Sequence, residues 1–229
     1  MARHALIVGA GTGISASFAR ALARDGYKVA IAARRSDKLA TLAAEIGAVS
    51  IPCNAVEPGE VAALFTKLDA AFSSLDVVLY NASRRARGPV AELDVEEVKQ
   101  SLLVSAYGGF LVGRAAAQRM LKQGAGAIFF TGASASVKGY PLSAPFAMGK
   151  FALRGLAQSM ARELQPKNIH VAHFVIDGGV ASETRMAPAE APDSLLDPDA
   201  VAETYLAVLK QPRSAWSTEI ELRPWLEKF

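Results

Sequence analysis

A strand, a glycine-rich turn and a helix follow one another at the start of the chain. Four apolar residues, 5–8, lead into Gly9, Gly11 and Gly13, and the residues after them change to the apolar spacing of a helix. Glycine at these positions permits a tight turn and a close approach of the backbone to a pyrophosphate, which the free amides of the helix start would face. This order predicts a dinucleotide-binding site. The alternative is a plain strand-to-helix turn, because Ile14 stands where the usual motif has its third glycine.

The rest of the chain keeps alternating between strand and helix patterns. Short apolar runs predict six further strands, and amphipathic stretches predict helices between them. The expected strands are 28–33, 49–53, 75–80, 127–131, 169–176 and 216–222, and the expected helices are 36–46, 57–72, 94–122, 143–164 and 198–209. Short loops between alternating elements imply crossover connections and a parallel sheet. We therefore expect an α/β fold in a single domain, residues 1–229: a doubly wound, seven-stranded parallel sheet with helices on both faces.

The composition fits one domain with a full core. Apolar residues make up 51% of the 229 residues, and the net charge of +3 is spread along the chain. This spread gives no indication of a nucleic-acid surface, and no uncharged run reaches membrane-spanning length. The single cysteine, Cys53, cannot form an internal disulfide, and the apolar stretch before Gly9 is too short for a signal-peptide core. We expect a cytoplasmic protein that binds neither nucleic acid nor membrane.

A long stretch without periodicity, residues 177–198, separates the last expected helix from the strand before it. Irregular segments of this length in compact domains are usually functional. We expect this segment to be a substrate lid.

Three motifs resemble those of the short-chain dehydrogenase/reductase family in order and spacing. They are Gly9-x-x-x-Gly13-x-Ser15, Tyr80-Asn81-Ala82-Ser83, and Lys150 as the lysine of a Tyr-x-x-x-Lys motif. The resemblance covers nearly the whole chain. It implies a Rossmann fold that binds NAD or NADP and transfers hydride between the nicotinamide and an alcohol or carbonyl.

The positions that carry the usual chemistry of this family differ here. Phe146 stands where the family usually has its catalytic tyrosine, Ala133 where it has its serine, and Ser105 where it has its helix asparagine. The resemblance therefore supports the fold and the cofactor site, and predicts a modified active site.

The resemblance also implies which residues contact the cofactor. Lys150 would hold the nicotinamide ribose. The other implied contacts are Gly9, Gly11, Thr12, Gly13 and Ile14 at the turn, Asn54 and Ala55 beside adenine, Asn81, Ala82 and Ser83 along the cofactor, and Gly178, Val180 and Ser182 around nicotinamide.

The end of the second strand favours NADP(H) over NAD(H). An acidic residue there would bind the ribose hydroxyls and repel a 2′-phosphate, but the sequence has Arg34 and Arg35 and no acid. We expect Arg34 to bind the phosphate, with Arg35 or Thr12 assisting, since the guanidinium fork suits phosphate geometry. The alternative is two solvated arginines before a helix.

Reducing a carbonyl by hydride leaves an alkoxide, which needs a proton or a stabilising charge, and phenylalanine supplies neither. The candidate catalytic residues are Lys150, alone or through a bound water, Ser134 and Tyr140. Weaker candidates nearby are Ser136, Ser143 and Tyr107. A substrate that arrives protonated, such as an imine, would need no donor.

Two functions follow from these observations. The first is an NADP(H)-dependent oxidoreductase with a modified active site, acting on a carbonyl, alcohol or imine of a small molecule. The second is an NADP(H)-binding sensor or scaffold without turnover. The resemblance further implies a homodimer or homotetramer that associates through the long helices.

The sequence contains two other patterns of charged or titratable residues. The run Ser83-Arg-Arg-Ala-Arg87 follows the fourth expected strand, where it would form either a solvated loop or a contact to an anionic substrate. His170 and His173 lie three apart in an expected strand, hence on opposite faces, so they predict no metal site.

Overall fold

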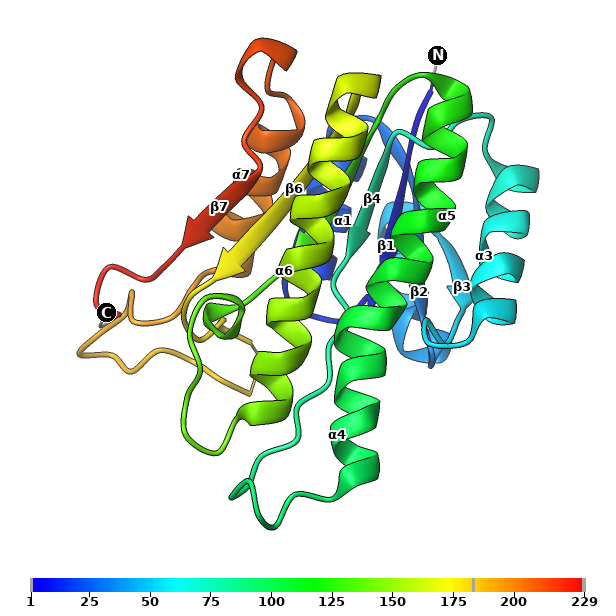
Figure 1. Cartoon of the computed structure of the whole chain (residues 1–229). Helices are drawn as coiled ribbons and strands as arrows, with labels where there is room; N and C mark the ends of the chain where they lie inside the picture. The colour runs from blue at the N-terminus through cyan, green and yellow to red at the C-terminus, as the bar shows by residue number, and fades with distance from the viewer. Residues whose placement is uncertain (1, 183, 228–229) are drawn as a thin grey trace.

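The computed structural model describes residues 2–182 and 184–227, and within these ranges seven strands form one parallel sheet (Figure 1). The strand order is β3-β2-β1-β4-β5-β6-β7, and every neighbouring pair is parallel. The strands are β1 (Arg3–Val8), β2 (Tyr27–Ala33), β3 (Val49–Pro52), β4 (Val77–Tyr80), β5 (Gly126–Thr131), β6 (Ile169–Ile176) and β7 (Glu219–Leu222). The predicted α/β class and parallel sheet are confirmed.

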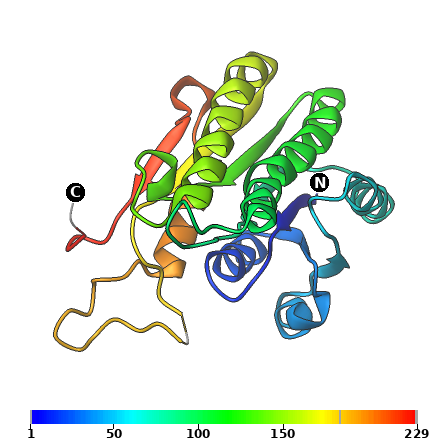
Figure 2. The ribbon, with the colours of Figure 1, turned by 60° about the horizontal axis from the view of Figure 1, so that its bottom comes forward.

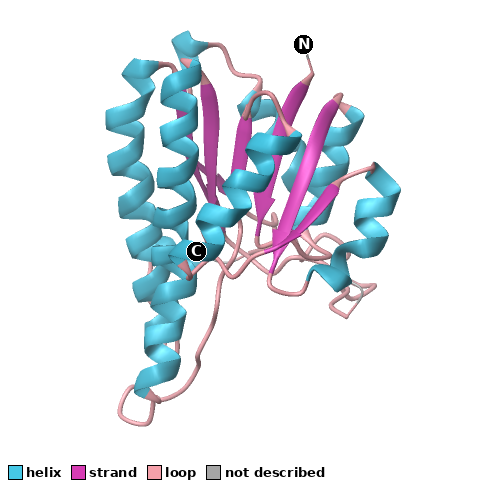
Figure 3. Ribbon diagram, turned by 90° about the vertical axis from the view of Figure 1, so that its right-hand side faces the viewer, coloured by secondary structure: helices cyan, strands magenta, loops and turns pink. Residues whose placement is uncertain are grey.

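Helices cover both faces of the sheet (Figure 3). One face carries α1 (Ile14–Arg24), α2 (Ala40–Ile46) and α7 (Pro198–Leu209), and the other carries α3 (Pro58–Ala71), α5 (Gly108–Gln123) and α6 (Ala144–Leu164). Helix α4 (Val95–Leu102) extends beyond the carboxyl edge of the sheet and packs against α6 (Figure 1). Successive strand residues point to opposite faces, so Ile7 packs in the first core and Leu6 in the second. The expected helices on both faces are confirmed.

The strand order reverses between β1 and β4, and this reversal positions the site. From β1 the chain winds outward through β2 to β3, and then returns to add β4 on the other side of β1. Connections leave the carboxyl ends of β1 and β4 in opposite directions, which opens a crevice at that edge.

A π-helical turn, Leu103–Tyr107, interrupts the helix that the sequence predicts over 94–122. The buried Tyr80 hydroxyl donates a hydrogen bond to the Val104 carbonyl within this turn. A Cβ at Gly108 would lie 2.4 Å from the same hydroxyl oxygen, so glycine allows the helix to pack on β4. The predicted long helix is present over 95–123, and it contains this wider turn at the contact with Tyr80.

Two other boundaries differ from the sequence prediction. The helix expected over 36–46 begins as a 3-10 turn, Ser36–Leu39, before α2. The strand expected over 216–222 begins only at Glu219, because the Trp216 ring stacks on His170 at 4.6 Å between centroids and its indole N–H donates to the Gln211 carbonyl.

The segment 177–198 extends from the carboxyl edge of the sheet as an irregular loop (Figure 2), described except for residue 183. Bridges join Val180 to Leu196 and Ser182 to Arg185. None of the described helices is long and apolar enough to cross a bilayer.

Candidate functional site

The turn after β1 packs tightly on one side and is open on the other. Gly9 has φ +83°, and a Cβ there would lie 2.3 Å from the Ala82 amide nitrogen, so only glycine fits against the end of β4. A Cβ at Gly11 or Gly13 would meet no atom within 4 Å. Helix α1 begins after Gly13 without a side-chain cap, so its first amides are available to an anion.

A hydrogen-bonded pair ties this turn to the end of β4. The Asn81 side-chain amide donates to Ser15 Oγ at 2.7 Å, and Ser15 Oγ donates to the Gly9 carbonyl at 3.1 Å. The sequence predicts Asn81 as a cofactor contact and indicates no partner for Ser15. Only the packing of β4 beside β1 brings the two side chains together.

A cavity of about 280 Å³ lies at the crevice between β1 and β4. Seven of the residues expected to contact the cofactor line it, namely Gly9, Arg34, Asn54, Ala55, Asn81, Ala82 and Ser83. Arg34 is exposed at its rim. Burial raises the pKa of the Cys53 thiol, which also lines the cavity, to about 11, so this thiol is not a nucleophile at neutral pH.

The other expected contacts lie around this cavity. Thr12 and Arg35 are exposed, whereas Ile14 is buried and packs in the core. Gly178 has φ +154°, and a Cβ added to it would lie 2.6 Å from Pro224 Cδ. The chain after β6 therefore packs closely on the segment after β7. Val180 and Ser182 follow it and lie outside the cavity.

Lys150 is buried inside helix α6, with 2% of its surface exposed. Its Nζ donates to the Thr131 carbonyl at the end of β5, at 2.8 Å. Burial, with the positive charge of Arg85, lowers the pKa of this amine to about 7. The charged and neutral forms of Lys150 are therefore both populated near neutral pH.

The Phe146 ring occupies the position of the missing tyrosine. It is buried, with its centroid 5.7 Å from Lys150 Nζ and 4.2 Å from the guanidinium carbon of Arg85. The two other substituted positions are also buried. The Ala133 amide donates to Ser136 Oγ at 3.1 Å, and Ser105 Oγ accepts from the Arg84 amide at 3.3 Å.

The remaining candidate proton donors differ in their surroundings. The Ser134 side chain helps to lower the pKa of Asp177, a carboxyl group whose pKa burial alone would raise. Tyr140 is 46% exposed, with its ring centroid 5.8 Å from Lys138 Nζ. Ser143 is half-buried, and Tyr107 is exposed at the end of the π turn.

The two strand histidines lie on opposite faces of the sheet. His170 stacks on Trp216, whereas His173 Nδ1 lies 3.1 Å from Glu219 Oε2, and a Cβ at Gly132 would lie 2.3 Å from His173 Nε2. Across the described ranges, no group of three or more His, Cys, Asp or Glu side chains is arranged to hold a metal ion.

Known proteins show the same architecture. Residues 3–193 match the family model described as short chain dehydrogenase. A solved short-chain dehydrogenase from Rhodopseudomonas palustris is 38% identical, with a TM-score of 0.85 over 97% of this chain and 99% of that chain. A metagenomic short-chain oxidoreductase in complex with NADP is 26% identical, with a TM-score of 0.85 over 98% of both chains.

A curated relative agrees with this placement. An uncharacterised oxidoreductase of Staphylococcus aureus is 28% identical over 226 residues, which are 96% of each protein. The family match spans most of the chain and includes the glycine turn, Asn81 and Lys150. The chain therefore belongs to the short-chain dehydrogenase family and is an oxidoreductase.

Proposed function

We propose that this protein is an NADP(H)-dependent oxidoreductase that acts on a carbonyl, alcohol or imine without the family's usual tyrosine. The proposal rests on the cavity beside the glycine turn, at the carboxyl edge of the sheet. It rests also on the buried Lys150 of α6, whose amine has a pKa of about 7. The similar metagenomic oxidoreductase that was solved with NADP supports the same class of cofactor.

The residues at the crevice fit a dinucleotide. The open side of Gly11 and Gly13 leaves room for a pyrophosphate against the amides of α1, and the cavity lined by Asn54 and Ala55 would take the adenine. Arg34 at the rim of this cavity would bind the 2′-phosphate of NADP(H), and no acidic residue follows β2 to oppose it. Thr12 and Arg35 would assist.

The other contacts follow from position along the same edge. Asn81, Ala82 and Ser83 would run beside the cofactor, and Lys150 would hold the nicotinamide ribose. Gly178, Val180 and Ser182, at the start of the segment 177–198, would surround the nicotinamide. When bound, the cofactor supplies or accepts the hydride.

Lys150 is the proposed proton donor in the reductive direction. Its ammonium group carries a proton below about pH 7 and can pass it to a developing alkoxide, directly or through one water. Ser134 and Tyr140 are the competing donors, but Ser134 interacts with Asp177 and Tyr140 faces Lys138.

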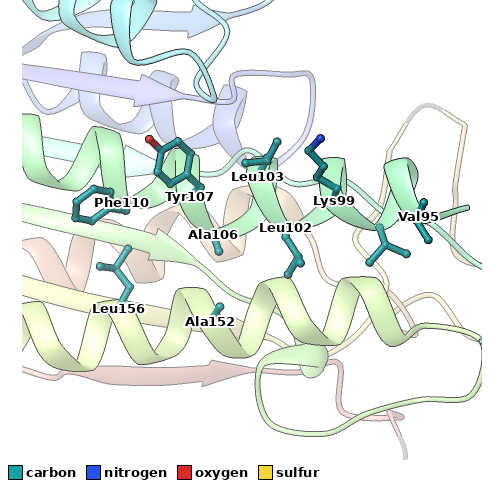
Figure 4. Close-up of a pocket in the computed structure, with 10 residues that line it drawn as sticks. Val95, Lys99, Leu102, Leu103, Ala106, Tyr107, Phe110, Ala152 and Leu156 are labelled. Carbon is teal, nitrogen blue, oxygen red and sulfur yellow. The ribbon is translucent and has the colours of Figure 1, made fainter.

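We also propose a lid and an oligomer. The segment 177–198 would close over the substrate. The outer face of α4, α5 and α6 would pair with another copy, forming a homodimer or homotetramer. A groove of about 620 Å³ lies on this face (Figure 4), and the exposed Tyr107 and Phe110 line it beside Ala152 and Leu156. The proposed compartment is the cytoplasm, where the free thiol of Cys53 would stay reduced.

The test is a titration of the purified protein with NADPH and NADH, followed by a carbonyl, alcohol and imine panel read at the nicotinamide absorbance. We expect NADPH to bind at least tenfold more tightly than NADH, and at least one panel member to be turned over. Failure to bind either nucleotide at millimolar concentration would overturn the proposal. NADPH binding without turnover of any compound would favour the sensor or scaffold instead.

A further inference from the structure

A pair of positive groups flanks the Phe146 ring. The guanidinium carbon of Arg85 lies 4.2 Å from the ring centroid, and Lys150 Nζ lies 5.7 Å from it. Arg85 comes from the loop after β4. From the sequence alone, this loop could be either solvated or a contact to an anionic substrate. The stack on Phe146 turns this arginine toward the proposed active site while the side chain remains accessible to solvent.

Two further arginines act electrostatically on Arg85: Arg87 in its own loop and Arg185 in the segment 177–198. The Arg185 guanidinium folds back within the segment 177–198, where a Cβ on Gly179 would lie 2.2 Å from its Nη2. Partial burial, with the positive charges of Arg185 and Arg87, lowers the pKa of Arg85. Both segments therefore contribute positive charge that acts on Arg85.

The basic residues around this group already have carboxylate partners. Arg84 pairs with Glu97 at 2.6 Å, and both Lys138 and Arg223 pair with Asp177. For Arg85, Arg87 and Arg185, in contrast, no carboxylate of the described residues lies within 4.0 Å of the guanidinium nitrogens. Positive charges that lie near one another favour the binding of an anion between them.

We infer that the substrate carries a carboxylate or phosphate group, which Arg85 and Arg185 bind at the mouth of the site with Arg87 adding charge. This inference rests on the proposed oxidoreductase function and names its substrate class. Guanidinium groups bind both anions in bidentate fashion, and Arg85 stacked on Phe146 is held in one orientation. An anion held there keeps the rest of the substrate beside Lys150.

The test compares ketones that differ only in charge, on protein saturated with NADP⁺ so that the nucleotide site is filled. The carboxylate arm is 4-oxopentanoate against its methyl ester, and the phosphate arm is dihydroxyacetone phosphate against dihydroxyacetone. Binding is measured by calorimetry at constant ionic strength, and NADPH oxidation is followed separately. We expect at least one anion to bind at least tenfold more tightly than its neutral partner, and the better arm identifies the anion.

The variants are Arg85→Gln, Arg185→Gln and the matched control Arg84→Gln, which removes an equal charge from the same loop. Losing a charge-assisted hydrogen bond should weaken anion binding about ten- to hundredfold in the first two, and less than threefold in the control. Equal binding of anion and neutral partner, no binding of either anion at 50 mM, or equal effects of all three variants would overturn the inference.

The same measurements distinguish failure of the proposed oxidoreductase function from failure of the anion site. If anions bind through Arg85 and Arg185 but no NADPH is oxidised, the anion site stands and catalysis on these ketones fails. If NADP⁺ itself does not bind, the calorimetry is repeated without it in the same variants, and the same outcomes decide the inference.

Discussion

Lys150 Nζ donates to the carbonyl oxygen of Thr131 at 2.8 Å, which fixes the amine at the carboxyl end of β5, beneath the Phe146 ring. This hydrogen bond is satisfied by the neutral amine as well as by the ammonium ion. Burial and the charge of Arg85 favour the neutral form, so the pKa falls from 10.5 to about 7. Phe146 stands in place of the usual tyrosine, so the Lys150 amine is the titratable group beside that position.

The pH dependence of the reaction should follow Lys150. Below about pH 7 the ammonium ion can donate a proton, so single-turnover oxidation of NADPH by a carbonyl substrate should decline as the pH rises through 7. Alcohol oxidation needs the neutral amine and should rise over the same interval. Lys150→Met should lower the reductive rate at least about hundredfold and abolish both pH effects. Unchanged rates in Lys150→Met, with losses in Ser134→Ala or Tyr140→Phe, would assign the proton to those residues.

Phe146→Tyr should restore a stronger acid. A tyrosine ring in this position would carry its hydroxyl group near Lys150 and the guanidinium of Arg85, and both charges would lower its pKa. We expect kcat/KM for carbonyl reduction to rise at least about tenfold, since a positioned general acid is worth two to four orders of magnitude. Phe146→Leu is the control, because it removes the ring without adding a hydroxyl group. A gain in both variants would point to steric relief rather than proton transfer.

Arg34→Glu should reverse the nucleotide preference. The glutamate would repel the 2′-phosphate at the rim of the cavity and accept hydrogen bonds from the ribose hydroxyls of NADH. The dissociation constant for NADPH should rise about ten- to hundredfold, while that for NADH changes less than threefold. Fluorescence titration of both nucleotides measures this, with Arg162→Glu on the exposed side of α6 as the charge control. Equal losses of affinity for NADPH and NADH would indicate that Arg34 contacts a part of the cofactor that the two nucleotides share.

His173 should make the protein less stable in mild acid. Burial lowers its pKa from 6.5 to about 4, so between these values the unfolded imidazole binds a proton that the folded one does not. The free energy of unfolding therefore falls as the pH decreases through this window. His173→Gln should remove about 2 kcal/mol of the difference in unfolding free energy between pH 7.5 and pH 5. Urea unfolding at both pH values measures it, and parallel pH dependences for the two proteins would contradict the assignment to His173.

The sheet could be predicted because each strand is a short apolar run and each connection is short. The boundaries that moved depend on contacts between residues far apart in the sequence. Tyr80 selects the π turn through Val104, and Trp216 stacks on His170 instead of joining β7. No periodicity within either segment carries that information.

The residues of the candidate site also differ in whether the sequence alone predicts their contacts. The glycine turn and the cavity residues around it could be predicted because one local motif specifies them, and Gly9 is required by its contact with Ala82. The bond between Ser15 and Asn81 and the stack of Arg85 on Phe146 depend on tertiary packing. The arginine run was visible in the sequence, but only the fold shows which of its members faces Phe146 and which pairs with Glu97.

The apolar groove on the outer helices should disappear on self-association. Phe110 is 43% exposed and stacks on Tyr107 at 6.2 Å between centroids, beside the groove that α4, α5 and α6 form (Figure 4). Large aromatic side chains at the centre of such faces usually contribute most of the binding energy. Phe110→Asp should therefore raise the dissociation constant of the oligomer at least about tenfold, measured by light scattering across a dilution series. Met186→Asp is the control, because this side chain is 81% exposed in the segment after β6 and away from the groove. Equal dissociation of both variants, or a monomeric parent protein at every concentration, would exclude this face as the interface.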